Sequence, residues 1–139
     1  MTVEIKPVSK IELWRMVEQH WPELTDLDRQ SLSLCLRMTL DIWAGIIDDD
    51  LVCAFGVAPT TMVSNAAYIW VWTTKELSGN EFVFIRQSQL VIERLLLRFP
   101  ILYGLCEARA EQSKRWLRFL GAHFGPNRGG WAPFEIRAA

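Results

Sequence analysis

Three adjacent carboxylates, Asp48, Asp49 and Asp50, form the densest group of potential metal ligands in the sequence. They separate two short β-type runs, Ile42–Ile47 and Leu51–Ala58, as the turn of a hairpin would. Consecutive side chains in a tight turn point in different directions, and the ligand spacing of a calcium loop does not surround them. We therefore expect a solvated turn here and predict no metal site.

The thiols and the first histidine offer little for catalysis. Cys35, Cys53 and Cys106 are an odd, scattered set in apolar contexts, which predicts buried free thiols in a reducing compartment. Cys106 has no obvious base partner, so a place in the core is favoured over a nucleophilic role. His20 lies where the first predicted helix stops, which favours a partly exposed histidine over a catalytic one. The sequence has no Walker loop, dinucleotide fingerprint or serine triad.

The composition limits the possible functions. At 139 residues we expect one domain, residues 1–139, with a substantial core. Lys and Arg total 15 against 16 Asp and Glu, so no general basic surface for nucleic acid is predicted. The first ten residues lack an apolar signal region and no run is long enough to span a membrane, so we expect a cytoplasmic protein. Most of the seven tryptophans are expected in the core or an interface; an aromatic binding face is the alternative.

A strand and two helices are predicted ahead of the hairpin. Thr2–Lys6 alternate and end at Pro7, which favours a strand near an edge. Ser9 is a candidate N-cap for a helix that begins at Ile11. The second helix is expected over Leu27–Leu40, with its N-cap at Thr25 or Asp26 and the inward candidates Leu32, Cys35, Leu36 and Met38.

The second half of the sequence predicts a strand, a long helix, a strand and a short helix. Ala66–Thr74 is apolar on both faces, so we expect a central strand covered on both sides. A helix over Glu81–Phe99 is stopped by Pro100, and Ile101–Cys106 forms the next strand. An amphipathic helix from Glu111 ends at Gly121, and the last strand is Trp131–Arg137. The order β-α-α-β-β-β-α-β-α-β predicts an α/β (α+β) fold with a mixed central sheet.

This order of elements resembles the GNAT fold of acetyl-CoA-dependent N-acetyltransferases. The resemblance covers nearly the whole chain as topology and is sharpest in Trp116–Phe124, a helix ending in Leu-Gly before an aromatic and a FEIR strand. Leu102–Gly104 and Ser113–Ala122 resemble a narrower group, the GNAT-like proteins of tailed bacteriophages. These include internal virion or assembly proteins of short-tailed phages. The resemblance implies a sheet of about six to seven strands flanked by four helices.

The resemblance also implies a place for acetyl-CoA. In GNAT enzymes, the strand before the long helix pairs through its main chain with the pantetheine arm, and the next loop holds the pyrophosphate at the helix N-terminus. The corresponding loop Lys75–Glu81 lacks the paired glycines of the family, and Glu76 and Glu81 add negative charge where an anion would sit. A solvated loop that only caps the helix is therefore the alternative. The implied cofactor-binding residues are Trp72, Thr73, Thr74, Ser78, Gly79, Asn80 and, in the last helix, Ser113.

The catalytic groups of the family are only partly matched. Alignment on Gly121 places Ala110 at the usual Asn position and Leu117 at the position of the general-acid Tyr, and neither side chain can transfer a proton. A general base would be Glu107, at the carboxyl end of a strand beside the expected cleft, with Tyr103 or Tyr68 as alternatives.

Two functions follow from the resemblance. The first is an acyl-CoA-dependent N-acyltransferase with a degenerate cofactor loop and weak or lost catalysis, acting on an acceptor amine. The second is a non-catalytic phage virion or assembly protein that binds phage structural proteins, in the host cytoplasm or the virion. Trp14, Trp21, Trp43 and Trp131 would then be partner contacts, and a homo-oligomer is compatible with either function.

Overall fold

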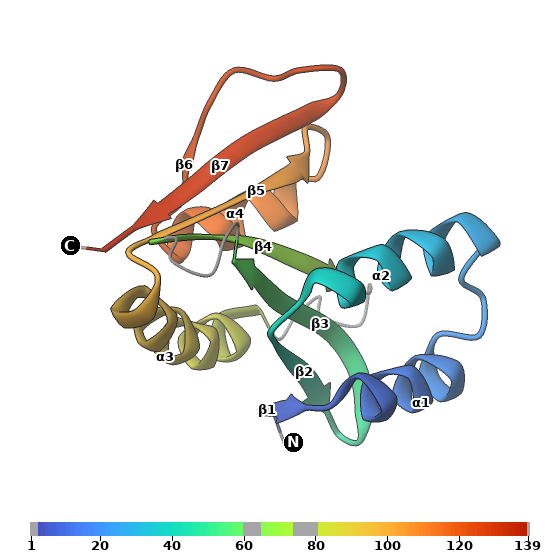
Figure 1. Ribbon diagram of the computed structural model, residues 1–139. Coiled ribbons are helices and arrows are strands. Elements are labelled where there is room, and N and C mark those ends of the chain that lie inside the picture. The colour runs from blue at the N-terminus through green and yellow to red at the C-terminus, as the bar shows by residue number, and fades with distance from the viewer. Residues whose placement is uncertain (1–2, 60–64, 74–80, 139) are drawn as a thin grey trace.

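The computed structural model describes residues 3–59, 65–73 and 81–138 and contains one seven-stranded sheet (Figure 1). The sheet order is β1-β2-β3-β4-β5-β7-β6, with β4 and β5 parallel and every other pair antiparallel. The elements in chain order are β1 (Val3–Val8), α1 (Lys10–His20), α2 (Asp26–Met38), β2 (Asp41–Ile47), β3 (Asp50–Pro59), β4 (Ala66–Thr73), α3 (Glu81–Arg98), β5 (Ile101–Glu107), α4 (Glu111–Phe119), β6 (His123–Phe124) and β7 (Trp131–Arg137). The expected fold class and element order are confirmed.

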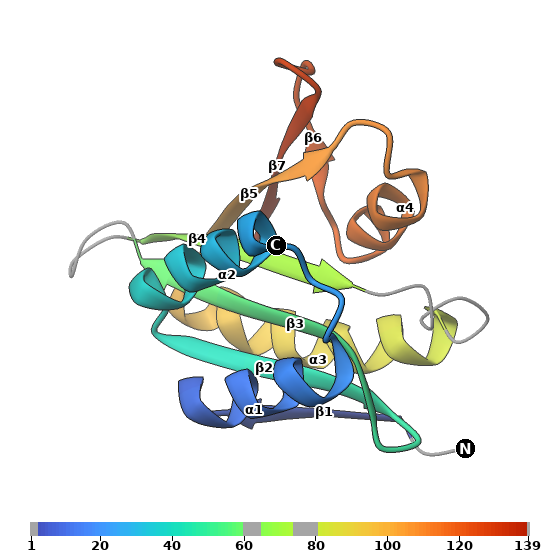
Figure 2. The same cartoon turned by 90° about the vertical axis from the view of Figure 1, so that its right-hand side faces the viewer.

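The helices lie on both faces of the sheet. Figure 2 shows α1 and α2 on one face of β2, β3 and β4, and α3 on the opposite face. One core cluster joins α1 and α2 to the sheet and includes Leu13, Val17, Leu32 and Trp70. Two further clusters lie under α3 and α4 and include Phe84, Ile92, Leu102 and Trp116. The strand β4 is therefore covered on both faces, as its apolar sequence predicted.

Local sequence signals set the ends of several elements. Ser9 and Thr25 each form a reciprocal capping box at the start of α1 and α2, with Glu12 and Asp28 as the third helical residues. At the end of α4, Gly121 has φ +99°, and the N–H of Ala122 donates to the carbonyl of Leu117 at 2.9 Å. This hydrogen bond satisfies a last-turn carbonyl, and the left-handed backbone at Gly121 turns the chain into β6.

The aspartate turn forms as expected. Asp48 and Asp49 connect β2 to β3 with φ values of 48° and 70°, which is the left-handed backbone of a two-residue hairpin turn. Asp50 is the first residue of β3 and lies 3.6 Å from the Nδ1 atom of His20. His20 therefore lies at the end of α1 beside a carboxylate of this hairpin.

Several predicted boundaries and orientations were wrong. Pro7 lies inside β1, where the edge position tolerates its missing N–H donor. The helix α2 ends at Met38, two residues early, because the N–H of Leu40 already bonds to Val57 of β3 at 2.8 Å. Met38 was expected to face inward but is 72% exposed.

No helix in the described ranges is both long and apolar enough to cross a membrane.

Candidate functional site

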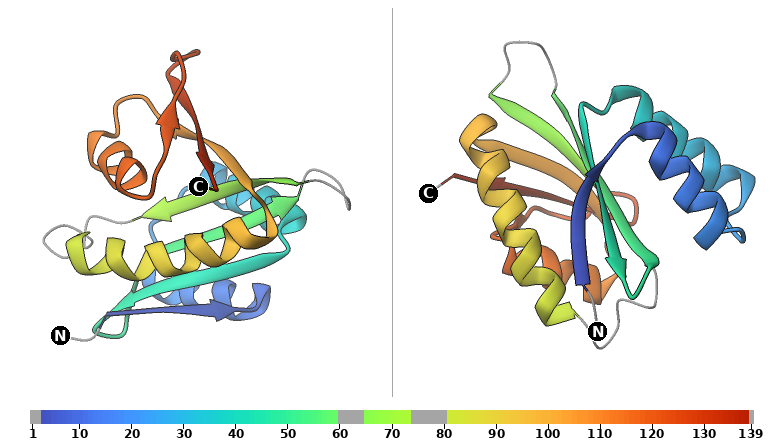
Figure 3. Two further views of the ribbon diagram at one scale, coloured as in Figure 1. Left: turned by 90° about the vertical axis from the view of Figure 1, so that its left-hand side faces the viewer. Right: turned by 90° about the horizontal axis from the view of Figure 1, so that it is seen from below.

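The central feature of the candidate site is the separation of β4 from β5. The two strands pair in parallel over only three register positions, from Ala66 with Ile101 to Tyr68 with Tyr103. Beyond these partners β4 continues to Thr73 and β5 continues to Glu107 without pairing to each other. Each strand keeps its outer neighbour over this part, since β4 still pairs with β3 and β5 with β7. The sheet is thus split along one line (Figure 3).

The split leaves two facing strand edges without a ladder partner. These edges are Ile69–Thr73 of β4 and Gly104–Glu107 of β5, which have no register partner on the other strand. Main-chain groups need partners, so an extended ligand with amide groups matches this gap chemically. Gly104 stands at its narrow end. A Cβ atom there would lie 2.6 Å from the carbonyl oxygen of Ile69 and 2.8 Å from the Phe134 ring.

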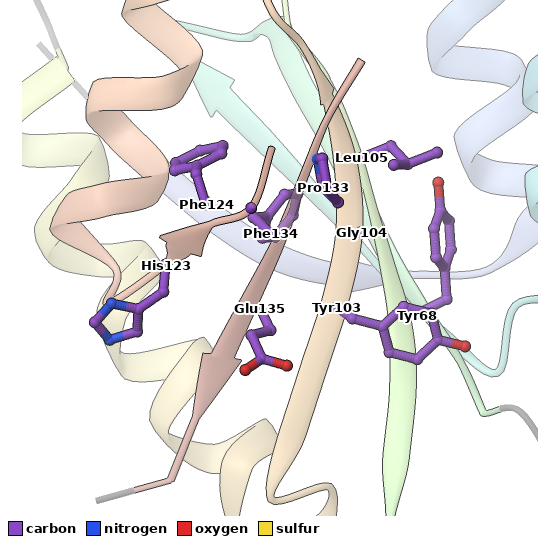
Figure 4. A pocket seen from close by; sticks show the side chains of 10 residues that line it. Tyr68, Tyr103, Gly104, Leu105, His123, Phe124, Pro133, Phe134 and Glu135 are labelled. Atoms are coloured by element: carbon purple, nitrogen blue, oxygen red, sulfur yellow. The ribbon is translucent and has the colours of Figure 1, made fainter. Parts of the chain in front are cut away.

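A cavity of about 620 Å³ opens beside the narrow end of the split. Figure 4 shows the rings of Tyr68 and Tyr103 on the β4 side of β5, with Glu135 and His123 on the side of β7 and β6. Four of the side chains that alternate with the buried residues of β5 and β7 face this space, namely Tyr103, Leu105, Pro133 and Glu135, while α4 packs on the buried residues of the other face. The lining residues are Tyr68, Tyr103, Gly104, Leu105, His123, Phe124, Gly125, Pro133, Phe134 and Glu135.

The two tyrosines meet where the strand pairing ends. The rings of Tyr68 and Tyr103 are in edge-to-face contact, with centroids 5.7 Å apart. Burial raises the pKa of the Tyr68 phenol, and the neighbouring Cys35 and Tyr103 raise it further. Tyr68 is therefore a neutral hydrogen-bond donor at physiological pH. The sequence proposed both tyrosines only as alternatives, because the contact between their strands could not be seen in it.

Glu107 lies at the far end of the open edge. It is the last residue of β5, is exposed, and stands opposite Trp131 of β7. It is four positions along the extended strand from Tyr103, a distance of about 13 Å. Glu107 does not belong to the lining of the cavity. The two candidate catalytic residues therefore cannot act on the same proton in this arrangement.

The predicted cofactor-binding residues fall into three groups. Trp72 and Thr73 are on the part of β4 that does not pair with β5, where the Trp72 side chain packs with the α1–α2 core cluster and Thr73 is exposed. Ser113 is half-buried in the first turn of α4. The remaining predicted residues, Thr74, Ser78, Gly79 and Asn80, lie outside the described residues.

The helix α4 carries no proton donor at Ala110 or Leu117, the two positions that the resemblance aligns with the usual Asn and the general-acid Tyr. Ala110 is its N-cap and makes no side-chain cap, and Leu117 is buried in the core cluster with Leu102 and Phe134. Its neighbour Trp116 is 5% exposed and packs on Phe84 of α3, with ring centroids 6.0 Å apart. The indole Nε1 of Trp116 is buried and has no hydrogen-bond partner among the described residues. A buried donor without a partner is energetically costly.

Glu135 and His123 were missed by the sequence reading. They are register partners on β7 and β6, and both line the cavity. The Nε atom of Arg137 donates to Glu135 Oε1 at 2.8 Å, and this hydrogen bond is the main reason that the pKa of Glu135 is lowered. The alternation in Trp131–Arg137 could have indicated that Glu135 shares a face with Pro133. It could not indicate which strand covers that face.

The tryptophans mostly belong to the core, as expected. Trp21 is 8% exposed, and its Nε1 donates to the carbonyl of Leu51 at 2.9 Å. Trp70 is 5% exposed and donates to Thr39 Oγ1 at 2.7 Å. Trp14 and Trp43 are partly buried against the core, whereas Trp131 is 46% exposed. The proposed tryptophan contact surface was therefore wrong for Trp21.

Comparison with known proteins identifies the architecture. The sequence matches no protein-family model and no curated protein. The GNAT domain of S. lividans PAT shares the fold with a TM-score of 0.68, 12% identity, and coverage of 99% of this chain and 92% of that one. The PaiA N-acetyltransferase of Thermoplasma acidophilum, solved with coenzyme A, has a TM-score of 0.67, 10% identity, and coverage of 99% and 100%. The Campylobacter jejuni N-acetyltransferase PseH, solved with acetyl coenzyme A, has a TM-score of 0.61, 7% identity, and coverage of 99% and 100%. The chain therefore has the GNAT fold of N-acetyltransferases.

Proposed function

We propose that this protein is an acyl-CoA-dependent N-acyltransferase whose acyl donor binds in the split between β4 and β5. The observation that carries the proposal is that strand pairing ends at Tyr68 and Tyr103 while both strands continue. When bound, acetyl-CoA would supply an activated thioester to an acceptor amine. The likeness to N-acetyltransferases solved with coenzyme A or acetyl coenzyme A supports the choice of donor.

The residues of the split fit a pantetheine arm. The free edge of Ile69–Thr73 offers main-chain donors and acceptors to its amides, and Gly104 leaves the narrow end free of a side chain. The indole N–H of Trp116, which has no hydrogen-bond partner among the described residues, is proposed as one more donor on the α3–α4 side. We assign Trp72 and Thr73, through their main chain, and Ser113 to the same ligand. On the sequence resemblance alone, Thr74 is proposed for the pantetheine arm, and Ser78, Gly79 and Asn80 are proposed for the phosphates.

The proton of the acceptor amine has two proposed destinations. Tyr103 lines the cavity and can contact an amine held there. Glu107 can act only on a group held near the end of β5, because it lies outside the lining. Leu117 at the general-acid position leaves protonation of the departing thiolate to Tyr68, Tyr103 or water.

The cavity favours an amine attached to an apolar or aromatic body. Its walls are mainly Tyr68, Tyr103, Phe134, Pro133 and Leu105. The carboxylate within the described lining, Glu135, is already neutralised by two hydrogen bonds from Arg137, at 2.8 and 3.4 Å. The site therefore offers aromatic contact in place of a free negative charge, and aromatic faces also attract the cationic form of an amine.

A second function, binding without catalysis, is favoured by a specific observation. Leu117 is 5% exposed and packed in the core at the position where GNAT enzymes place a tyrosine, so no proton donor can approach from there. The low glycine content of the loop Lys75–Glu81 also favours binding without catalysis. This reading would make the chain a phage virion or assembly protein. Its support is the resemblance of Leu102–Gly104 and Ser113–Ala122 to that group.

Titration with acetyl-CoA tests the donor site directly. Thermal unfolding in about 1 mM acetyl-CoA should raise the midpoint, since a ligand that binds only the folded state stabilises it by mass action. Thr73→Trp places a bulky group at the open end of the split and should abolish the shift. Lys6→Trp, at an exposed position of the edge strand β1, is the matched control and should keep it. Absence of a shift in the unmodified protein would contradict the enzyme proposal and leave the binding function.

A further inference from the structure

The outer face of α3 carries a stripe of exposed apolar side chains. Val83, Leu90 and Leu97 are 42%, 60% and 88% exposed. They are spaced seven residues apart, so they fall nearly in line over about 21 Å of helix. The opposite face of α3 already packs on the sheet through Phe84, Ile92 and other buried residues. In the left view of Figure 3, the described elements leave this outer side of α3 uncovered.

Charged residues beside the stripe are placed so that they would complement those on α3 of a second copy of the protein. Arg86 and Glu93 lie on one flank, seven residues apart and on either side of Leu90. Both are exposed, and no ion pair given by the described residues involves either of them. When two identical helices pack antiparallel about a two-fold axis, the same flank of each faces the other. Arg86 would then face Glu93 of the second copy, and Glu93 would face its Arg86.

The exposed apolar residues of α3 also match one another under this two-fold symmetry. With the two-fold axis at Leu90, this residue meets its own equivalent, and Val83 meets Leu97 of the second copy at both ends. The exposed set on α2, formed by Leu27, Leu34 and Met38, does not behave in this way. Antiparallel pairing of Leu27 with Met38 would set Leu34 against Ser31, which is polar. The placement of the exposed apolar residues therefore favours α3 over α2.

We propose that the protein self-associates through an antiparallel α3–α3 contact centred on Leu90. The contact is isologous, with Leu90 on the two-fold axis, Val83–Leu97 packing on both sides, and two Arg86–Glu93 ion pairs on one flank. A single helix pair buries less than the roughly 800 Å² per partner of a standard interface, so the dimer is weak. The contact does not involve the β4–β5 split, and it is independent of any acyltransferase activity.

Charge exchange in the full-length protein tests the arrangement. Sedimentation equilibrium from about 10 µM to about 1 mM should show a concentration-dependent dimer. Arg86→Glu alone and Glu93→Arg alone should each weaken association several-fold, because like charges then face each other across the axis. The double variant R86E/E93R restores opposite charges at both places and should associate within about threefold of the unmodified protein. Equal weakening in the double variant would overturn the proposed pairing.

Two substitutions of Leu90, each with a matched control at Leu34, test the position of the two-fold axis. Leu90→Glu should abolish the dimer, whereas the matched change Leu34→Glu on α2 should leave it intact. Leu90→Cys should form an intermolecular disulfide rapidly under mild oxidation, because the two thiols meet on the axis, whereas Leu34→Cys should not. A protein that remains monomeric at 1 mM, or a dimer that is lost with L34E and kept with L90E, contradicts the proposal. Circular dichroism of each variant shows that the fold is retained.

Discussion

Tyr68 of β4 and Tyr103 of β5 are the last partners of the parallel ladder, and their rings meet edge to face at 5.7 Å. On one side of this contact the sheet is continuous, and on the other side its two halves separate. The same pair lines the cavity on the uncovered face of β5 and β7. The end of the strand pairing and the entrance of the cavity thus coincide at two phenol side chains.

Gly104 should be essential for the close approach of the two strands. The Cβ of Gly104→Ala would lie 2.6 Å from the carbonyl oxygen of Ile69, a main-chain atom that can move only with β4. We expect a loss of about 1–3 kcal/mol in the free energy of unfolding, measured by urea denaturation. Gly125→Ala is the control, since its nearest contact is 3.3 Å to a side-chain atom of Pro133. Equal losses for both variants would contradict the special role of Gly104.

Tyr103 should matter for turnover more than for folding. In Tyr103→Phe the ring contact with Tyr68 is kept and only the hydroxyl is lost, so we expect the thermal midpoint to change little. If Tyr103 transfers the proton, kcat of acetyl-CoA turnover with an arylalkylamine should fall about 100-fold with KM nearly unchanged. Glu107→Gln should cause a smaller change, because Glu107 is outside the cavity lining. The opposite order would assign the base to Glu107.

Trp116 and Trp70 should respond differently to loss of the indole N–H. Trp70→Phe removes a 2.7 Å hydrogen bond to Thr39 in the core, whereas Trp116→Phe removes no bond among the described residues. Both variants shrink a buried ring, so the difference isolates the hydrogen bond. We expect Trp70→Phe to cost about 1 kcal/mol more, measured by denaturant unfolding. Under the proposed function, isothermal titration should show weaker acetyl-CoA binding for Trp116→Phe only. Unchanged binding would remove Trp116 from the site.

The capping box of α1 should make stability depend on pH in the acid range. The backbone N–H of Ser9 donates to Glu12 Oε1 at 3.1 Å, and with the Ser9 side chain it lowers the pKa of Glu12 from its ordinary value of 4.5. The folded state therefore binds the Glu12 proton less tightly than the unfolded state. The resulting stabilisation is fully present above pH 4.5 and disappears as the pH falls through the lowered folded-state pKa.

Urea unfolding between pH 7 and pH 3 measures this dependence. Glu12→Gln should lose less stability over that range than the unmodified protein, because its side chain does not titrate. Glu4→Gln removes an exposed carboxyl outside the capping box and is the control. Parallel curves for Glu12→Gln and the unmodified protein would show that the hydrogen bond does not perturb Glu12.

Much of the fold could be read along the chain because its signals are local. Ser9 and Thr25 predicted helix starts, the aspartates predicted the hairpin, and Gly121 predicted the end of α4. Each depends on backbone geometry within a few residues, which the residue types themselves restrict. The alternation of apolar and polar side chains then identified most buried positions. Met38 was misplaced because the pattern of α2 does not show which of its apolar residues the sheet leaves uncovered.

The candidate site could not be predicted from local sequence signals. The sequence by itself determined that a strand, a long helix and a second strand follow one another, and that Tyr103 and Glu107 share one strand. Only the tertiary structure decided that β4 and β5 pair for three positions and then part, that Tyr103 meets Tyr68, and that Glu135 and His123 join them. These contacts link residues far apart in the chain. They depend on the summed packing of α3 and α4 against the sheet, which no short stretch of sequence specifies.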